Sequence, residues 1–221
     1  EGPSLDHHRK TKGPMAERDA VWVVHHVAAG LAVAHERGIV HRDVKPANIL
    51  LGPKTDPRPD GAPFHARLCD FGVARWRDSN DASLTQGFVV GTPRYMAPEQ
   101  CTGLAPVTPA ADVYALGLVL FEILTGEPPY SPGATTLDIM RAHVEEAPKR
   151  ADTLRPELSP GVVALIERCL SKEPTERPVD GGALADLLRG LLTPPTVDEH
   201  HGHPEPISTH DPDVLEAVHE W

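Results

Sequence analysis

Residues 41–48 read His-Arg-Asp-Val-Lys-Pro-Ala-Asn, and residues 70–72 read Asp-Phe-Gly. Between these polar stretches, residues 49–51 and 66–69 have strand-like composition and are joined by a linker rich in proline and glycine. We expect the two segments to pair as an antiparallel hairpin. Such a hairpin would bring the residue before its first strand next to the residue after its second strand.

The polar residues around this hairpin are of the types that phosphoryl transfer from ATP requires. That reaction needs a carboxylate to accept the proton of the attacking hydroxyl, a cation against the transferred group, and oxygen ligands for Mg²⁺. The residues that supply these groups are Asp43, Lys45, Asn48 and Asp70. The pattern indicates a site for ATP and Mg²⁺.

Most of the remaining chain has helical periodicity. Residues 1–16 are polar and are expected to be irregular, whereas apolar residues repeat at helical spacing from about Glu17 to Arg37, followed by Gly38 as a left-handed terminus. Residues 112–124 are apolar on nearly every side and predict a buried central helix. Further helices are expected at about 137–145, 161–170 and 182–191. The expected fold is mainly α (α+β), a helical body with a small β-hairpin at the site.

Composition separates a body from a tail. The chain of 221 residues carries a formal net charge of −11, of which residues 193–221 contribute seven acidic side chains and neither Lys nor Arg. We expect one domain over residues 1–192 and an acidic linker rich in Pro and His, without a packed core, over 193–221. Val214, Val218 and Trp221 could share one face of a short helix there, either as a docking peptide or, in the interpretation we prefer, as a frayed stub.

Charge and cysteine usage limit the partners and the compartment. The sequence shows none of the clustered cations that nucleic acids or membrane surfaces require. The longest apolar run, residues 113–124, is shorter than the roughly 20 residues of a membrane-spanning helix. The three cysteines are widely spaced and suggest neither a disulfide framework nor a metal motif. We therefore expect a cytoplasmic protein with no nucleic-acid partner and no membrane segment in this chain, although a full-length parent could be membrane-anchored outside it.

Residues from about 1 to 191 resemble the C-terminal lobe of the eukaryotic-type (Hanks-type) Ser/Thr protein kinases, especially their bacterial branch. Each short motif alone is weak evidence, but together they follow the order of the family. The matching residues are His41–Asn48, Asp70–Gly72, Ala97–Glu99, Asp112 and Arg177.

The resemblance implies catalytic roles for three residues. Asp43 would be the base that accepts the hydroxyl proton. Lys45 would neutralise charge on the γ-phosphoryl oxygens and therefore also contact the nucleotide. Thr92 would bridge these two side chains and shape the peptide groove.

The resemblance also implies how ATP and Mg²⁺ would be held. Asn48 and Asp70 would bind Mg²⁺ through oxygen atoms. Leu50 would contact the adenine ring from below, although an ordinary core leucine is almost as good an account of that residue.

Regulatory and architectural roles follow from the same family pattern. Arg42 could pair with a phosphate added to the following loop by another kinase, with Thr85 as the first candidate acceptor and Ser83 as the second. Asp112 would bind the backbone around His41 and Arg42. The other architectural residues are His41 and Phe71, as packing groups, and Glu99 with Arg177, as a buried ion pair.

One part of the family pattern has no counterpart in these residues. The first forty residues contain no glycine-rich phosphate loop and no strand with a nucleotide-pairing lysine, so an N-terminal lobe sheet is not expected. The first interpretation is a fragment of an enzyme that phosphorylates Ser or Thr of protein substrates, weak or inactive alone. The alternative is a non-catalytic, pseudokinase-type interaction module. A small-molecule phosphotransferase is disfavoured by Thr92 and Ala97–Glu99, which serve peptide substrates in the family.

Overall fold

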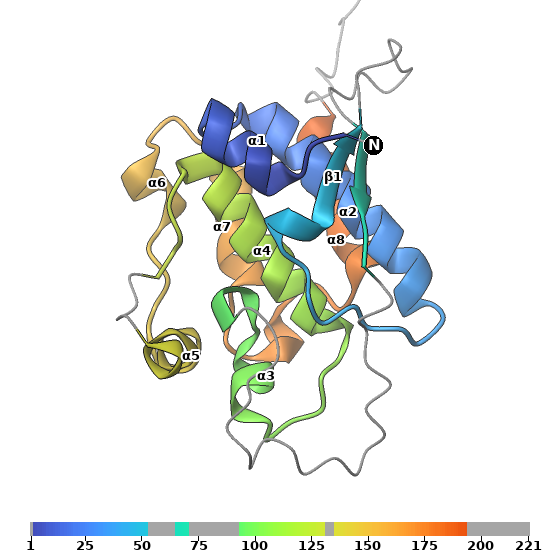
Figure 1. Cartoon of the computed structure of the whole chain (residues 1–221), viewed down its shortest axis with the longest axis vertical. Coiled ribbons are helices and arrows are strands. Elements are labelled where there is room, and N and C mark those ends of the chain that lie inside the picture. Colours follow the sequence, from blue (N-terminus) through green and yellow to red (C-terminus); the bar gives the residue numbers. More distant parts are fainter. Residues whose placement is uncertain (1, 53–64, 71–92, 131–134, 194–221) are drawn as a thin grey trace, which may run out of the picture.

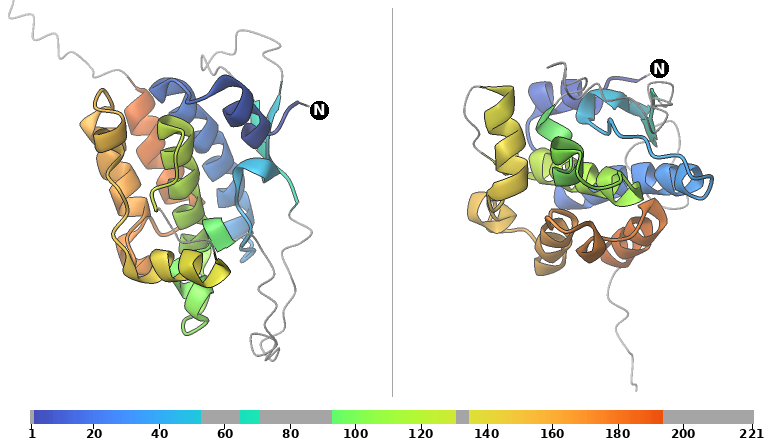
Figure 2. Two further views of the ribbon diagram at one scale, coloured as in Figure 1. Left: turned by 60° about the vertical axis from the view of Figure 1, so that its left-hand side comes forward. Right: turned by 90° about the horizontal axis from the view of Figure 1, so that it is seen from below.

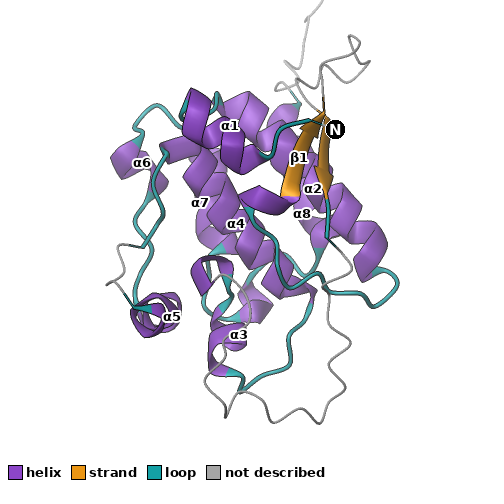
Figure 3. Cartoon of the chain, in the orientation of Figure 1, coloured by secondary structure: helices purple, strands orange, loops and turns teal. Residues whose placement is uncertain are grey.

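The structure is a computed structural model, and it describes residues 2–52, 65–70, 93–130 and 135–193. In chain order, its helices are α1 Leu5–Lys12, α2 Glu17–His35, α3 Pro98–Thr102, α4 Pro109–Thr125, α5 Thr136–Glu145, α6 Ala151–Leu154, α7 Pro160–Cys169 and α8 Gly181–Leu192. The strands are β1 Ile49–Gly52 and β2 His65–Leu68, and the 3₁₀ turns are η1 Pro46–Asn48, η4 Pro93–Tyr95 and η5 Pro174–Glu176. The described fold is therefore mainly helical with one small sheet, as predicted (Figures 1 and 3).

Helix α4 is the centre of the helical body. Its residues from Ala110 to Leu124 are all buried, because α2, α7 and α8 pack around it (Figure 1). The helix begins at Pro109, three residues before the predicted start, since a proline at the first helical position needs no hydrogen-bond partner for its nitrogen. It ends at Gly126, whose φ of 81° is in the left-handed region.

The long helix α2 packs against α8 on one side and against the hairpin on another. At the α8 contact, a Cβ on Gly181 would lie 2.6 Å from the carbonyl oxygen of Ala28, so only glycine permits this approach. Figure 2 shows α8 running beside α2 for most of its length. This packing anchors α2, from whose end the chain runs into residues 41–48.

The predicted hairpin is confirmed. Strands β1 and β2 are antiparallel, with Ile49 opposite Leu68 and Gly52 opposite His65. The start of the chain extends this small sheet, because Ser4 bridges Leu50 and the N–H of Leu51 donates to the carbonyl of Pro3 at 2.9 Å. The last residue of η1 and the residue after β2 thus leave the same end of the hairpin.

The expectation that residues 1–16 are irregular is wrong. Residues 5–12 form α1, which Ser4 caps by accepting a hydrogen bond from the N–H of His7 and which Gly13 ends with a φ of 75°. A single fully buried residue, Leu5, anchors the helix, while Asp6 pairs with Arg9 and Lys10 on its surface. A helix with one apolar anchor has no periodicity to detect.

Smaller differences concern helix ends. Helix α2 stops at His35 rather than Arg37. Gly38 has the left-handed conformation that was expected of it, with a φ of 72°. Among the helices of the described ranges, none combines the length and apolarity that a membrane crossing requires.

Candidate functional site

Three of the predicted site residues meet in the loop between α2 and β1. Nζ of Lys45 lies 3.0 Å and 2.8 Å from the two carboxylate oxygens of Asp43. Nδ2 of Asn48 donates to the carbonyl oxygen of Asp43 at 2.9 Å and to its Oδ2 at 3.2 Å. The buried residues Val44 and Pro46 alternate with them and anchor the loop in the core. One carboxylate is thereby flanked by a cation and an amide.

Asp70 adjoins this group through the end of the hairpin. The N–H of Cys69 donates to the carbonyl of Asn48 at 2.9 Å, so the residue that follows Cys69 emerges beside η1. Asp70 is exposed and has a φ of 66°, a left-handed conformation that costs a non-glycine residue about 1–3 kcal/mol. Leu50, half-buried on β1, pairs with Arg67 across the sheet.

A buried carboxylate beneath the loop holds its backbone. Oδ2 of Asp112 accepts a hydrogen bond from the N–H of His41 at 2.7 Å, and Oδ1 accepts one from the N–H of Arg42 at 2.8 Å. The contact predicted for Asp112 is therefore present. Arg42 needs this support because its φ is 65°, which an L-residue seldom adopts.

His41 is buried and its ring connects the loop to the hairpin. Its Nε2 donates to the carbonyl of Cys69 at 3.1 Å, and its Nδ1 accepts a hydrogen bond from the N–H of Asp43 at 3.3 Å. Donation from one ring nitrogen and acceptance at the other correspond to a neutral imidazole. The side chain thus orders the two polar stretches relative to each other.

The predicted ion pair lies farther from the loop. Nη1 and Nη2 of Arg177 donate to the carboxylate of Glu99 at 2.8 Å and 3.0 Å, and both side chains are almost fully buried. Arg177 also donates to three backbone carbonyls and lies 4.8 Å over the ring of Tyr114. Every donor direction of the guanidinium is used, which suits a buried charge.

Two supporting residues were not predicted from sequence. Gln100 donates to the carbonyl of Arg42 at 3.2 Å, which ties α3 to the loop, and its Oε1 accepts from the N–H of Ala97. Nε2 of His35 donates to Oδ2 of Asp112 at 2.9 Å. The signal for His35 was its position on the buried stripe of α2, where a polar ring requires a partner.

The donor chemistry suits Mg²⁺ with few protein ligands. In the described ranges, no group of three or more His, Cys, Asp or Glu side chains could hold a metal. A site for Mg²⁺ commonly uses one or two protein oxygens and completes its shell with phosphates and water. Asp70 offers a carboxylate, and the contacts of Asn48 through its amide nitrogen leave its oxygen as a ligand. These residues therefore fit the ion.

Some predicted residues lie outside the described part of the chain. They are Phe71, Ser83, Thr85, Thr92 and the segment from 194 to 221. Their expected roles stay predictions.

Comparison with known proteins identifies the class. The family model described as "Protein kinase domain" matches residues 1–187. The chain belongs to the protein kinase family, and its relatives are of the Hanks-type Ser/Thr kind found in bacteria.

The named relatives are bacterial Ser/Thr kinases. The chain is 39% identical over 191 residues to "Serine/threonine-protein kinase PkaA" of Streptomyces coelicolor, an alignment that covers 86% of this chain and 32% of the relative. It is 40% identical over 202 residues to "Serine/threonine-protein kinase PknD" of Mycobacterium tuberculosis, covering 90% and 28%. It is 36% identical over 181 residues to PknB of Mycolicibacterium smegmatis, covering 81% and 27%. The chain thus spans about a third of the length of these relatives or less.

Proposed function

We propose that this chain supplies the substrate-binding and catalytic lobe of a Ser/Thr protein kinase that transfers the γ-phosphoryl group of ATP to protein hydroxyls. The observation that carries the proposal is the contact of Lys45 and Asn48 with the carboxylate of Asp43, beside the end of the hairpin where Asp70 emerges. A base, a cation and oxygen ligands for Mg²⁺ are the parts this reaction needs.

The proposed step assigns one task to each group. The substrate hydroxyl oxygen forms a bond to the γ-phosphorus, the bond from that phosphorus to the β–γ bridging oxygen breaks, and ADP leaves. Asp43 accepts the hydroxyl proton, and Lys45 offsets negative charge on the transferred group. Asn48 and Asp70 would hold Mg²⁺, which would neutralise charge on the phosphates.

We further propose that the 221-residue chain alone transfers little phosphate. The residues that would cover the adenine and bind the α- and β-phosphates in this family are not among its first forty. Water would then compete for the transferred group, and the nucleotide would be bound from one side only. Protein substrates, an activating kinase and a cytoplasmic location belong to the same proposal.

The test compares two proteins, each as wild type and as Asp43→Asn. One is the 221-residue chain, and the other is a longer protein in which a nucleotide-binding N-terminal lobe precedes it. Transfer of labelled phosphate from Mg-ATP to a mixture of Ser- and Thr-containing peptides is measured. We expect the longer protein to be active, to lose about 10²- to 10⁴-fold in rate with Asp43→Asn, and to stop when EDTA removes Mg²⁺.

Asp186→Asn is the matched control, because this side chain is 72% exposed on α8 and lies in an ordinary surface pair with Arg189. It should leave the rate unchanged. A longer protein that transfers no phosphate, or one that is insensitive to Asp43→Asn while still capturing a partner, would favour the interaction module. Efficient Asp43-dependent transfer by the 221-residue chain would contradict the proposal that it is weak alone.

A further inference from the structure

A chain of hydrogen bonds crosses the interior between α4, α5 and the turn η4. Nζ of Lys172 lies 2.8 Å from the hydroxyl of Tyr130, and that hydroxyl lies 2.9 Å from the hydroxyl of Tyr114. The hydroxyl of Tyr114 lies 3.0 Å from Nδ1 of His143, whose Nε2 lies 3.1 Å from the carbonyl oxygen of Arg94. We call these five residues the Lys172–Arg94 relay.

The two ends of the relay determine the direction of every bond in it. Lys172 can only donate, and the carbonyl of Arg94 can only accept. Tyr130 therefore donates to Tyr114, Tyr114 donates to Nδ1 of His143, and His143 carries its proton on Nε2. A single arrangement of protons satisfies all members, so the relay has one defined state.

Its central members are shielded from water. Tyr114, Tyr130 and His143 are 0%, 4% and 2% exposed, and Lys172 also lies 4.5 Å over the ring of Tyr130. Burial lowers the pKa of His143 to about 4, so its imidazole is neutral at physiological pH. Buried polar groups are costly unless all are paired, and an apolar core would be cheaper at these positions.

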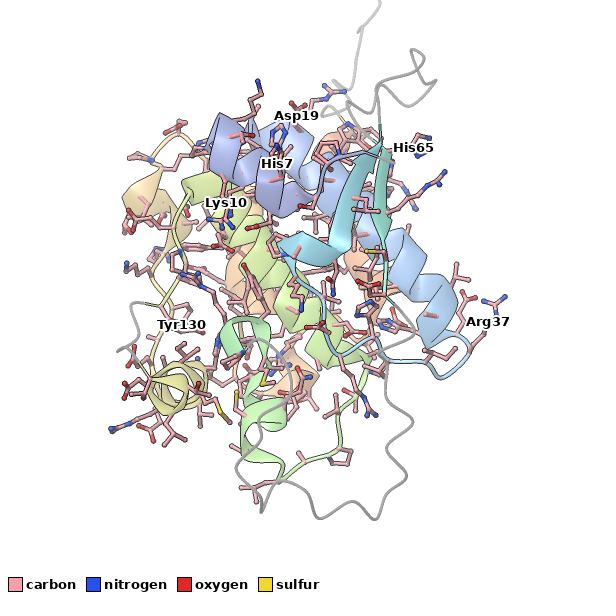
Figure 4. The ribbon with its side chains drawn as sticks, in the orientation of Figure 1. His7, Lys10, Asp19, Arg37, His65 and Tyr130 are labelled. Carbon is pink, nitrogen blue, oxygen red and sulfur yellow. The ribbon has the colours of Figure 1, made fainter. Side chains whose placement is uncertain are left out.

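The relay ends on the backbone of η4. In the same turn, Tyr95 donates to Oε2 of Glu122 at 2.5 Å, and the N–H of Met96 donates to the carbonyl of Pro93 at 3.2 Å. The turn is thus held by α4 at Tyr95 and by α5 at Arg94. Figure 4 shows Tyr130 in the segment that leads from α4 towards α5.

We propose that His143 is a positioning residue, which fixes the Arg94 carbonyl and with it the 93–95 turn in the orientation that receives the protein substrate. The inference rests on the proposed function, because η4 leads directly into Ala97–Glu99, the segment expected to serve peptide substrates. His143 contacts neither substrate nor nucleotide in this scheme. Its effect passes through one backbone carbonyl.

Two substitutions separate this role from simple packing. His143→Gln retains an amide N–H at the distance of Nε2 and can still donate to Arg94. His143→Asn places its amide at the distance of Nδ1, so it can still accept from Tyr114 but does not reach Arg94. Both lose the ring, but asparagine also fills less space, so His143→Met is the packing control: it matches glutamine in length and has no N–H to donate.

The first readout is amide hydrogen exchange of Met96 in the 221-residue chain, followed by NMR. We expect exchange about tenfold faster in His143→Asn, the equivalent of one hydrogen bond, and close to the wild-type rate in His143→Gln. Imidazole ¹⁵N shifts of the wild type should show the Nε2–H form. Equal exchange in the two variants, or an Nδ1–H form, would overturn the assignment.

The second readout is the kinetics of the longer protein with its N-terminal lobe. His143→Asn should raise KM for a peptide substrate about tenfold, leave kcat and KM for ATP within about twofold, and be rescued in His143→Gln. If His143→Asn instead changes kcat and KM for ATP as much as it changes KM for the peptide, the substrate role is wrong. If the wild type transfers no phosphate, the proposed function fails together with the substrate role, whereas Met96 exchange still decides whether His143 holds the turn.

Discussion

Nε2 of His35 lies 2.9 Å from Oδ2 of Asp112, and Nδ1 of the same ring accepts a 3.0 Å hydrogen bond from the N–H of Gly181. One imidazole therefore connects the first residue of α8 to the carboxylate that holds His41 and Arg42. The start of the last helix and the loop that carries Asp43 are ordered together, although more than a hundred residues separate them in sequence.

Asp112→Asn should destabilise the fold although it preserves the shape of the side chain. Three donors, from His35, His41 and Arg42, meet its two oxygens. In asparagine one of those oxygens becomes an NH₂ group, so at least one buried donor faces another donor. We expect a loss of about 1–3 kcal/mol, measured by urea unfolding. Asp186→Asn on the surface of α8 is the control, and an equal effect of the two substitutions would contradict the network.

The ion pair of Glu99 and Arg177 should show strong coupling. Glu99→Gln leaves a buried guanidinium without its counter-charge, at a cost of about 3–5 kcal/mol. The double variant Glu99→Leu with Arg177→Met removes both charges and should be more stable than Glu99→Gln alone. Chemical unfolding of the single and double variants measures this difference.

The exposed pair of Arg141 and Glu145 on α5 supplies the comparison. These side chains are 73% and 56% exposed, so Glu145→Gln should change stability by about 0.5 kcal/mol or less. A Glu99→Gln variant that is as stable as Glu145→Gln would show that the buried pair is unimportant.

Two helical glycines should respond to alanine in opposite directions. A Cβ on Gly117 of α4 would lie 2.6 Å from Cβ of Cys169 at the contact of α4 with α7, so Gly117→Ala should destabilise by about 1–3 kcal/mol. Gly30 of α2 is exposed and has no atom within 4 Å of its Cβ position, so Gly30→Ala should stabilise by about 0.5–1 kcal/mol. Thermal unfolding of both variants tests this prediction. Shifts of the two melting temperatures in the same direction would contradict it.

These glycines also show what sequence could and could not reveal. Periodicity located α2, α4, α5, α7 and α8, and alternation with turn residues located the hairpin, because those signals are local. The close approach at Gly117 depends on Cys169, which is distant in sequence and lies on another helix. Nothing local distinguishes it from Gly30.

In the site, too, sequence predicted the residues that belong to short motifs and missed those that depend on distant contacts. The motifs and the hairpin predicted that Asp43, Lys45, Asn48 and Asp70 would meet. The structure joins the first three through the carboxylate of Asp43, and Asp70 leaves the hairpin at the same end. The supports from His35 and Gln100 were missed, because both depend on contacts between residues far apart in sequence. Gln100 reaches the carbonyl of Arg42 from α3, and His35 acts through Asp112 on α4. The α1 helix was missed for a different reason, since Leu5 alone supplies its buried contact.

Stability should depend on His143 in the acid range. In the unfolded chain a histidine titrates near 6.5, whereas burial lowers the pKa of His143 in the fold to about 4. Between these values the unfolded state binds a proton that the folded state does not, so the free energy of unfolding falls as pH decreases from about 6.5 to about 4. This lowering of the pKa corresponds to a loss of roughly 3 kcal/mol in the free energy of unfolding.

His143→Gln keeps the bond to Arg94 but cannot titrate. Urea unfolding at pH 7 and pH 4.5 should therefore show that this variant loses less stability in acid than the wild type. His7→Gln, on the exposed surface of α1, is the control. Because carboxylates also titrate below pH 5, the quantity compared is the difference in acid-induced destabilisation between the variants. Identical pH dependence in all three proteins would show that His143 is not held neutral.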